Sequence, residues 1–73
     1  MFELNLCLNR LGRNLKKERK KKKLSQEELS FISSIDKNYI SKIECGKANI
    51  SVSTLNKISK ALKVRLSELL RGA

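Results

Sequence analysis

Residues 24–46, LSQEELSFISSIDKNYISKIECG, decide the fold because they hold the start and stop signals of two short helices. Ser25 and Glu28 form an S-x-x-E capping box, in which each side chain accepts a hydrogen bond from the other residue's backbone N–H. A helix is therefore expected to begin at the residue after Ser25. Asp36 is a good N-cap for a second helix, and Gly46 favours the left-handed backbone that ends one. The stretch predicts two helices joined by a tight turn.

The apolar residues of these helices indicate which faces are buried. Leu29 and Ile32 are expected to face inward from the first helix. In the second, Ile40 and Ile43 lie one turn apart on the inner face. At about 3.6 residues per turn, Asn38 points almost directly away from that pair. The second helix, about 36–45, should therefore present a polar and cationic outer face.

Apolar stripes predict three further helices around this pair. The first begins at about Glu3 or Asn9 and ends at about Lys22. Ser51 or Ser53 caps a fourth helix, and a short fifth helix finishes the chain. The stripe residues are Leu4, Leu8, Leu11 and Leu15, then Leu55, Ile58 and Leu62, then Val64, Leu66, Leu69 and Leu70. We expect one compact all-α domain of five helices over residues 1–73, with residues 1–8 as an apolar N-terminal extension.

The charge of the chain points to a polyanionic partner. Lys and Arg together number 17 and Asp and Glu 7, so the formal net charge is +10. Nucleic acid and an anionic membrane surface are the candidate polyanions. The apolar stripe of the first helix is needed by the core, which argues against insertion into lipid. We therefore expect the partner to be double-stranded DNA and not a membrane. The alternative is that the first helix is a basic helix that binds RNA or a membrane surface.

Catalysis and metal binding have little support in the sequence. The chain has no histidine, and Cys7 and Cys45 lie far apart without a CxxC pair, which argues against a zinc site. No nucleophile–base pair can be assembled without histidine. We expect no enzyme activity and no cofactor. The sequence also lacks a secretory h-region and a transmembrane run, so a cytoplasmic location, in bacteria or in phage infection, is expected, with both thiols reduced.

From Leu11 to Leu70 the sequence resembles the helix-turn-helix family of phage repressors, Cro and xenobiotic-response-element type bacterial regulators, which share a lambda-repressor-like fold. The residues that carry the resemblance are Leu11, Gly12, Leu15, Arg19, Leu24, Ser25, Gln26, Glu28, Leu29, Ile35, Tyr39, Ile40, Ser41, Ile43, Glu44, Gly46, Leu55, Ile58, Ala61, Leu62 and Val64. The run IDKNYISKIECGKANIS, residues 35–51, looks particularly like the small controller proteins of restriction–modification operons. Three positions depart from the family pattern: Ser34 and Lys23 replace Gly, and Ser30 replaces Ala.

The resemblance implies a sequence-specific transcription regulator that places the helix at about 36–45 in the major groove of a palindromic operator. The side chains suited to base edges are Lys37, Asn38 and Lys42. Candidate phosphate contacts are Gln26 and Ser51 at the starts of the second and fourth helices, Lys47 and Asn49 in the loop after the third helix, and Ser41 on the third helix. The family pattern also implies that Arg19 pairs with Glu44 and fastens the first helix to the end of the third.

A homodimer is expected, because one small module covers only a few base pairs and two related by a two-fold axis read two half-sites. The candidate dimer surface is the fifth helix, with Leu66, Leu69 and Leu70, together with the apolar N-terminus. The alternative function is that of an antitoxin, which binds a toxin partner and uses DNA binding to regulate its own operon.

Overall fold

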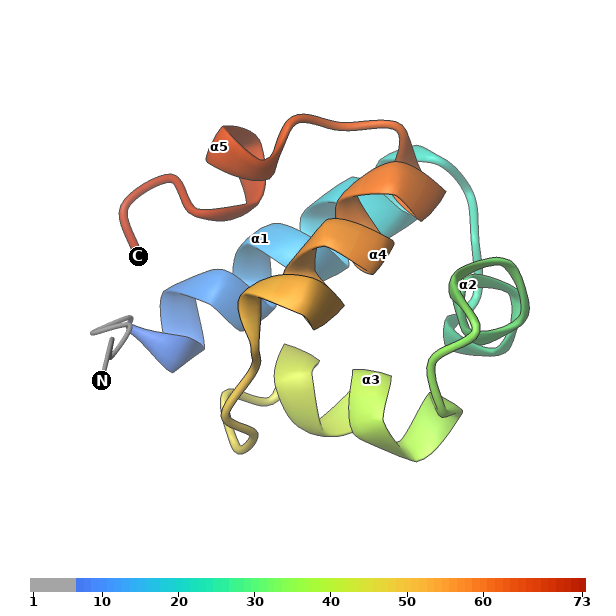
Figure 1. Cartoon of the computed structure of the whole chain (residues 1–73), viewed down its shortest axis with the longest axis horizontal. Helices are drawn as coiled ribbons and strands as arrows, with labels where there is room; N and C mark the ends of the chain where they lie inside the picture. The colour runs from blue at the N-terminus through green and yellow to red at the C-terminus, as the bar shows by residue number, and fades with distance from the viewer. Residues whose placement is uncertain (1–6) are drawn as a thin grey trace.

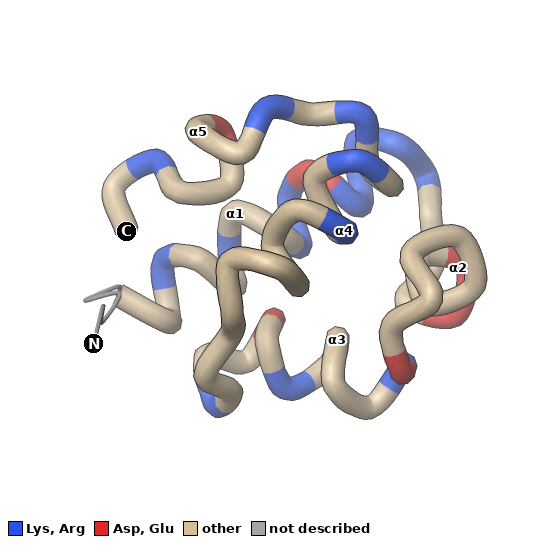
Figure 2. Tube along the Cα trace, in the orientation of Figure 1, with Lys and Arg blue, Asp and Glu red and all other residues tan. Residues whose placement is uncertain are grey.

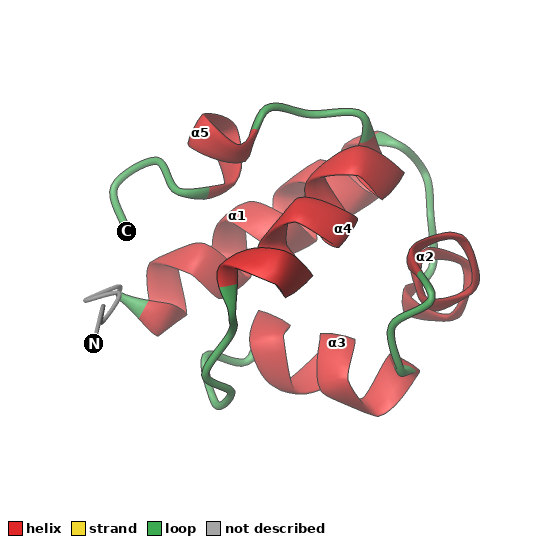
Figure 3. Cartoon of the chain, viewed as in Figure 1, coloured by secondary structure: helices red, strands yellow, loops and turns green. Residues whose placement is uncertain are grey.

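Five α-helices wrap around one apolar core in the computed structural model, which describes residues 7–73 (Figure 1). In chain order they are α1 (Leu8–Lys21), α2 (Gln26–Ser33), α3 (Lys37–Glu44), α4 (Val52–Leu62) and α5 (Leu66–Leu69). Within the described range there is no strand, and short loops join the helices (Figure 3). The predicted all-α, five-helix class is confirmed. The proposed start at Glu3, the stripe residue Leu4 and most of the N-terminal extension lie outside the described residues.

Local capping explains where the central helices begin. The Ser25 hydroxyl accepts from the Glu28 N–H at 2.9 Å, and the Glu28 carboxylate accepts from the Ser25 N–H at 2.8 Å. The Asp36 carboxylate accepts from the Asn38 N–H at 3.0 Å and starts α3. Ser51, rather than Ser53, caps α4. These predicted starts are confirmed because each depends on residues no more than three positions apart.

Left-handed backbone ends or follows several helices. Gly46 has φ 72°, as predicted, and follows α3 without strain. Lys23, Ser34 and Lys63 adopt φ values of 57°, 59° and 57° although each carries a Cβ atom. Such a conformation costs an L-residue about 1–2 kcal/mol. Ser34 and Lys23 are two of the positions at which the sequence departs from the family glycine, so the backbone turn is kept and the residue is strained.

The core is built from leucine and isoleucine of all five helices and the loops between them. Its fully or largely buried members are Leu11, Leu15, Leu29, Ile35, Ile40, Ile43, Ala48, Ile50, Leu55, Ile58, Leu62 and Leu69. Leu24, which follows α1, packs against this cluster. Gly12 allows α1 to approach α3 closely, because a Cβ there would lie 2.7 Å from the Glu44 carbonyl oxygen and would also meet that of Ile43.

The predicted orientation of Ile32 is wrong, because its side chain is 49% exposed. On α2 the inward direction lies between Leu29 and Ser33, which are both buried, and Ile32 stands at the margin. Ser33 fits the inner face because its hydroxyl donates to the Leu29 carbonyl at 2.6 Å. Ser33 is the last residue of α2, and Ser34 follows it as the C-cap.

The predicted role of Leu69 in a dimer surface is also wrong, because its exposed fraction is 0%. The amide of Asn14 on α1 donates to the Leu69 and Arg71 carbonyls, both at 2.8 Å, and draws the end of α5 onto α1. Leu69 therefore belongs to the monomer core. Val64 precedes α5 rather than forming part of it, and its N–H donates to the Ser59 carbonyl.

Candidate nucleic-acid interface

The outer face of α3 is polar, cationic and open to solvent. Lys37, Asn38 and Lys42 are exposed, whereas Ile40 and Ile43 on the opposite face are fully buried. The helix lies along one edge of the molecule with this outer face uncovered by the other helices (Figure 1). Its length and exposure suit the major groove of B-form DNA, which is about 12 Å wide and admits one α-helix. The structure thus groups the three side chains proposed to reach base edges.

Contacts at both ends of α3 fix its position on the core. At the start, the turn from α2 is closed by the Ser30 hydroxyl, which donates to the Ile35 carbonyl at 2.5 Å. Farther along, the Tyr39 hydroxyl donates to the Asn49 carbonyl at 2.6 Å and ties α3 to the loop before α4. Sequence reasoning missed this second contact, because nothing in the spacing of Tyr39 and Asn49 indicates that they meet.

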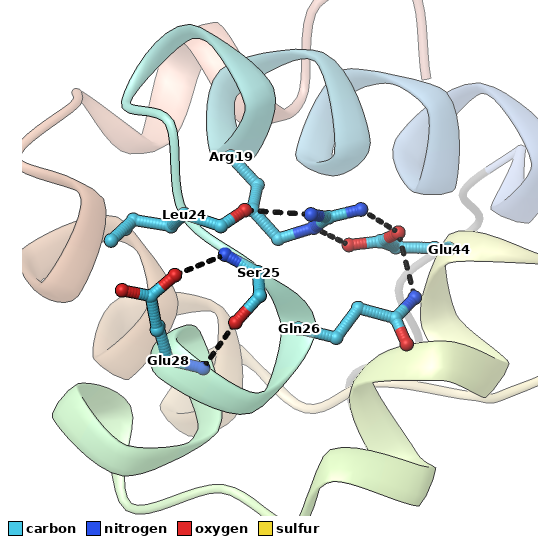
Figure 4. A network of polar contacts seen from close by, with 6 residues as sticks. All are labelled: Arg19, Leu24, Ser25, Gln26, Glu28 and Glu44. Atoms are coloured by element: carbon cyan, nitrogen blue, oxygen red, sulfur yellow. Dashed lines mark hydrogen bonds and ion pairs between the residues drawn. The ribbon is translucent and has the colours of Figure 1, made fainter.

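A buried ion pair fastens α3 to α1 (Figure 4). Arg19 Nε lies 2.7 Å from Glu44 Oε2, and Arg19 Nη2 lies 3.0 Å from Oε1, so the contact is bidentate. Arg19 also donates to the Leu24 carbonyl at 2.7 Å. The hydrogen bond to Glu44 raises the pKa of Arg19 above its ordinary value, against the opposing effect of burial. The Arg19–Glu44 pair that the family pattern implied is therefore present.

The same carboxylate positions Gln26, the first residue of α2. The Gln26 amide nitrogen donates to Glu44 Oε1 at 3.0 Å (Figure 4). One of its two amide hydrogens is used in this bond, and the other is free to donate elsewhere. Glu44 therefore links α1, the end of α3 and the start of α2, so that a phosphate donor at Gln26 would be held in fixed register with the exposed face of α3.

The N-termini of α2 and α4 differ in charge. The first turn of α2 contains Glu27 and Glu28, and the backbone hydrogen bond from Ser25 lowers the pKa of Glu28 below its ordinary value. The first turn of α4 contains no acidic residue. Since anions prefer an uncompensated helix N-terminus, the start of α4 is the more favourable of the two candidate phosphate sites.

Three of the four remaining candidate phosphate contacts lie just before α4. Lys47, Asn49 and Ser51 are exposed in the segment between α3 and α4, and Ser41 is half-buried on α3. The Ser51 hydroxyl already accepts from the Thr54 N–H at 3.1 Å, so its part is to shape the helix start.

Within residues 7–73 there is no cluster of metal ligands and no membrane-spanning helix. Cys7 and Cys45 are exposed free thiols, and no group of three or more potential metal ligands is present in this range. None of the described helices has the length and apolar character needed to cross a membrane.

A short helix, a tight turn and a second helix whose polar face is exposed define a helix-turn-helix domain. The family model described as Helix-turn-helix matches residues 15–69, and the chain belongs to this family. It is accordingly a DNA-binding regulator of the helix-turn-helix class.

Individual relatives agree with this assignment. Control protein C.MunI from Mycoplasma sp is 49% identical over 61 residues, which make up 82% of either chain. Control protein C.SmaI from Serratia marcescens is 37% identical over 60 residues, 82% of this chain and 71% of that relative. Among solved structures, the restriction-modification controller protein C.AhdI from Aeromonas hydrophila matches with a TM-score of 0.83 at 37% identity, over 85% of this chain and 94% of that chain.

Proposed function

We propose that this protein is a controller of a restriction–modification operon that binds a palindromic operator as a homodimer, with α3 of each subunit in the major groove. The observation that carries the proposal is the exposed row of Lys37, Asn38 and Lys42 on a helix whose other face is buried. The similarity to control proteins C.MunI and C.SmaI supports the choice of operon.

Specificity and affinity come from different residues in this proposal. Asn38 pairs its amide with adenine, and Lys37 and Lys42 donate to guanine O6 and N7. Lys47, Asn49 and the N-terminus of α4 bind phosphates on one side of the groove, and Gln26 binds them on the other. The protein acts in the cytoplasm, without a cofactor and without catalysing a reaction.

In this proposal the dimer forms through the face of α5 whose apolar side chains are partly exposed in the monomer. Leu66 and Leu70 are half-buried and flank the fully buried Leu69. For the two α3 helices to enter successive turns of the major groove, an isologous contact through this edge must set them about 34 Å apart, one turn of DNA.

Selection of bound duplexes from a random pool tests the proposal. We expect an enriched palindrome with half-sites one helical turn apart, and two protein chains for each duplex by analytical ultracentrifugation. A pool that stays random after several rounds would contradict sequence-specific binding, and one chain per duplex would contradict the dimer.

A second candidate function is that of an antitoxin with a protein partner, and one observation favours it. Phe31 is 86% exposed and Ile32 is 49% exposed on the outer side of α2, where they form an apolar surface that no described residue covers. Co-expression with the neighbouring reading frame and purification of a stable one-to-one complex that Phe31→Ser abolishes would favour this function over the controller.

A further inference from the structure

The positive charge of this chain is concentrated away from α3. Only three cations lie on α3 and the loop after it: Lys37, Lys42 and Lys47. Residues 19–23 and 57–65 carry nine cations and no acidic residue. In Figure 2 these two segments, which end α1 and α4 and lead into the following loops, lie on the side of the molecule opposite to α3. The densest charge is therefore not on the face that reads bases.

Six exposed cations of these segments form what we call the distal basic surface: Lys20, Lys22, Lys23, Lys60, Lys63 and Arg65. Of the nine, Arg19 is excluded because it is buried against Glu44, and Lys21 because its Nζ lies 3.5 Å from Glu18 Oε2. Lys57 is excluded because it lies in the middle of α4, before the last turn of that helix. Within the described part of the chain, none of the six forms an ion pair. Like charges left unpaired in this way repel one another, so the surface favours a polyanionic partner.

The helix dipole accounts for only part of this charge. Lys20 and Lys60 lie in the last turns of α1 and α4, where a cation is stabilised. Lys22 and Lys63 are the C-cap residues of these helices, whereas Lys23 and Arg65 follow the helix ends, where the effect of the dipole falls off. Lys23 and Lys63 moreover adopt left-handed backbone, in which glycine would be free of strain. A requirement for the cation itself would explain why lysine stands at these two positions.

We propose that the distal basic surface binds the sugar–phosphate backbone of a second segment of double-stranded DNA while α3 occupies the first. The chemistry fits a phosphodiester backbone, because flexible cations neutralise phosphates but read no sequence. The two sites face opposite sides of the domain, whose shorter extents are 20 and 19 Å. A duplex segment that lies against α3 is therefore separated from the distal basic surface by the width of the domain. The inference rests on the proposed function only in assigning the first segment to α3.

The test compares two triple variants with the same change in charge. Lys60→Gln with Lys63→Gly and Arg65→Gln alters the distal basic surface, and Lys37→Gln with Lys42→Gln and Lys47→Gln alters the α3 side. Full-length protein is bound to an immobilised short duplex of random sequence, and a labelled second duplex is then captured. The readouts are protein bound to the first duplex and second duplex captured per protein.

We expect the distal variant to keep first-duplex binding but to capture at least about tenfold less second duplex, with a salt slope shallower by about 3. The α3-side variant should bind the first duplex more weakly and retain second-duplex capture per bound protein. The melting temperature of the distal variant should not fall, because Lys63→Gly relieves a strained backbone.

Two results would overturn the inference while leaving the proposed function intact. One is equal second-duplex capture by the distal variant and the wild type. The other is a wild type that captures no second duplex but binds phosphatidylglycerol vesicles through the same cations, which would assign the surface to lipid.

Discussion

Removing the Glu44 carboxylate should destabilise the fold more than any surface substitution, because it leaves a buried cation without its anion. The side chains of Arg19 and Glu44 are only 10% and 3% exposed. In Glu44→Ala, Arg19 loses both of its bonds to the carboxylate and keeps only the one to the Leu24 carbonyl. Gln26 loses its acceptor at the same time.

The size of the effect follows from the burial of the pair. Breaking a buried ion pair by removing one partner costs about 3–5 kcal/mol. We expect about 3 kcal/mol, the lower end, because Arg19 keeps one carbonyl partner and a small exposed edge. A domain of this length has a free energy of unfolding of about 4–11 kcal/mol. The variant should therefore lose a large share of its stability.

Urea unfolding followed by circular dichroism measures this loss. With a slope of about 1 kcal/mol per molar urea, the midpoint should fall by about 3 M. Glu27→Ala is the matched control, since this glutamate is exposed on α2, and it should change stability by less than about 1 kcal/mol.

A double-mutant cycle with Arg19→Met and Glu44→Met separates the pair from its surroundings. The double variant should be about as stable as the wild type, because apolar side chains replace both charges. A loss below about 1 kcal/mol for Glu44→Ala, or additive single effects in the cycle, would refute the argument that the buried charge is the source of the cost.

Three further outcomes are expected from local features of the fold. Ser34→Gly should raise the free energy of unfolding by up to about 1 kcal/mol because glycine adopts the left-handed backbone without strain. Ser33→Gly, inside α2, should lower the free energy of unfolding. Chemical denaturation curves of the two variants distinguish these effects. Gly12→Ala should lower the melting temperature clearly, because its Cβ would push α1 away from α3, and calorimetry showing a rise instead would contradict that close approach. The lowered pKa of Glu28 means that the fold favours its ionised form, so the contribution of Glu28 to stability is present above the ordinary pKa of 4.5 and is lost as the pH falls below that value. Glu28→Gln should therefore flatten the acid limb of a stability–pH profile.

Features of the fold that depend on neighbouring residues were predictable from the sequence. The capping box at Ser25, the caps at Asp36 and Ser51 and the left-handed Gly46 each involve only a few consecutive positions. The stripe with Leu11 and Leu15 was equally clear, because it repeats over several turns of α1.

Features that depend on tertiary packing were not predictable. Ile32 and Ser33 lie on either side of the inward direction of a helix of eight residues, too short for periodicity to choose between them. Leu69 was predicted to lie on a dimer surface, but its side chain is buried in the core. The hydrogen bond from the Asn14 amide to the Leu69 carbonyl, which joins α1 and α5, has no signal in the local sequence. The bond between Tyr39 and Asn49 joins segments ten residues apart with no local signal.

The candidate site was predictable in part. The outward direction of Asn38 follows from its position relative to Ile40 and Ile43, and the structure leaves it exposed. The link from Glu44 to Gln26 and the separation of the distal cations from α3 required the arrangement of the helices in space.

The most direct test of the assignment of α3 as the base-reading helix is the ratio of affinities for the selected operator and for random DNA. This ratio is measured for the wild type, for Asn38→Ala and Lys42→Ala, and for the control Lys47→Ala. We predict that Asn38→Ala and Lys42→Ala each lose about 1–3 kcal/mol of discrimination, whereas Lys47→Ala weakens binding to both duplexes equally. Unchanged ratios for Asn38→Ala and Lys42→Ala would show that another surface of the protein reads the bases.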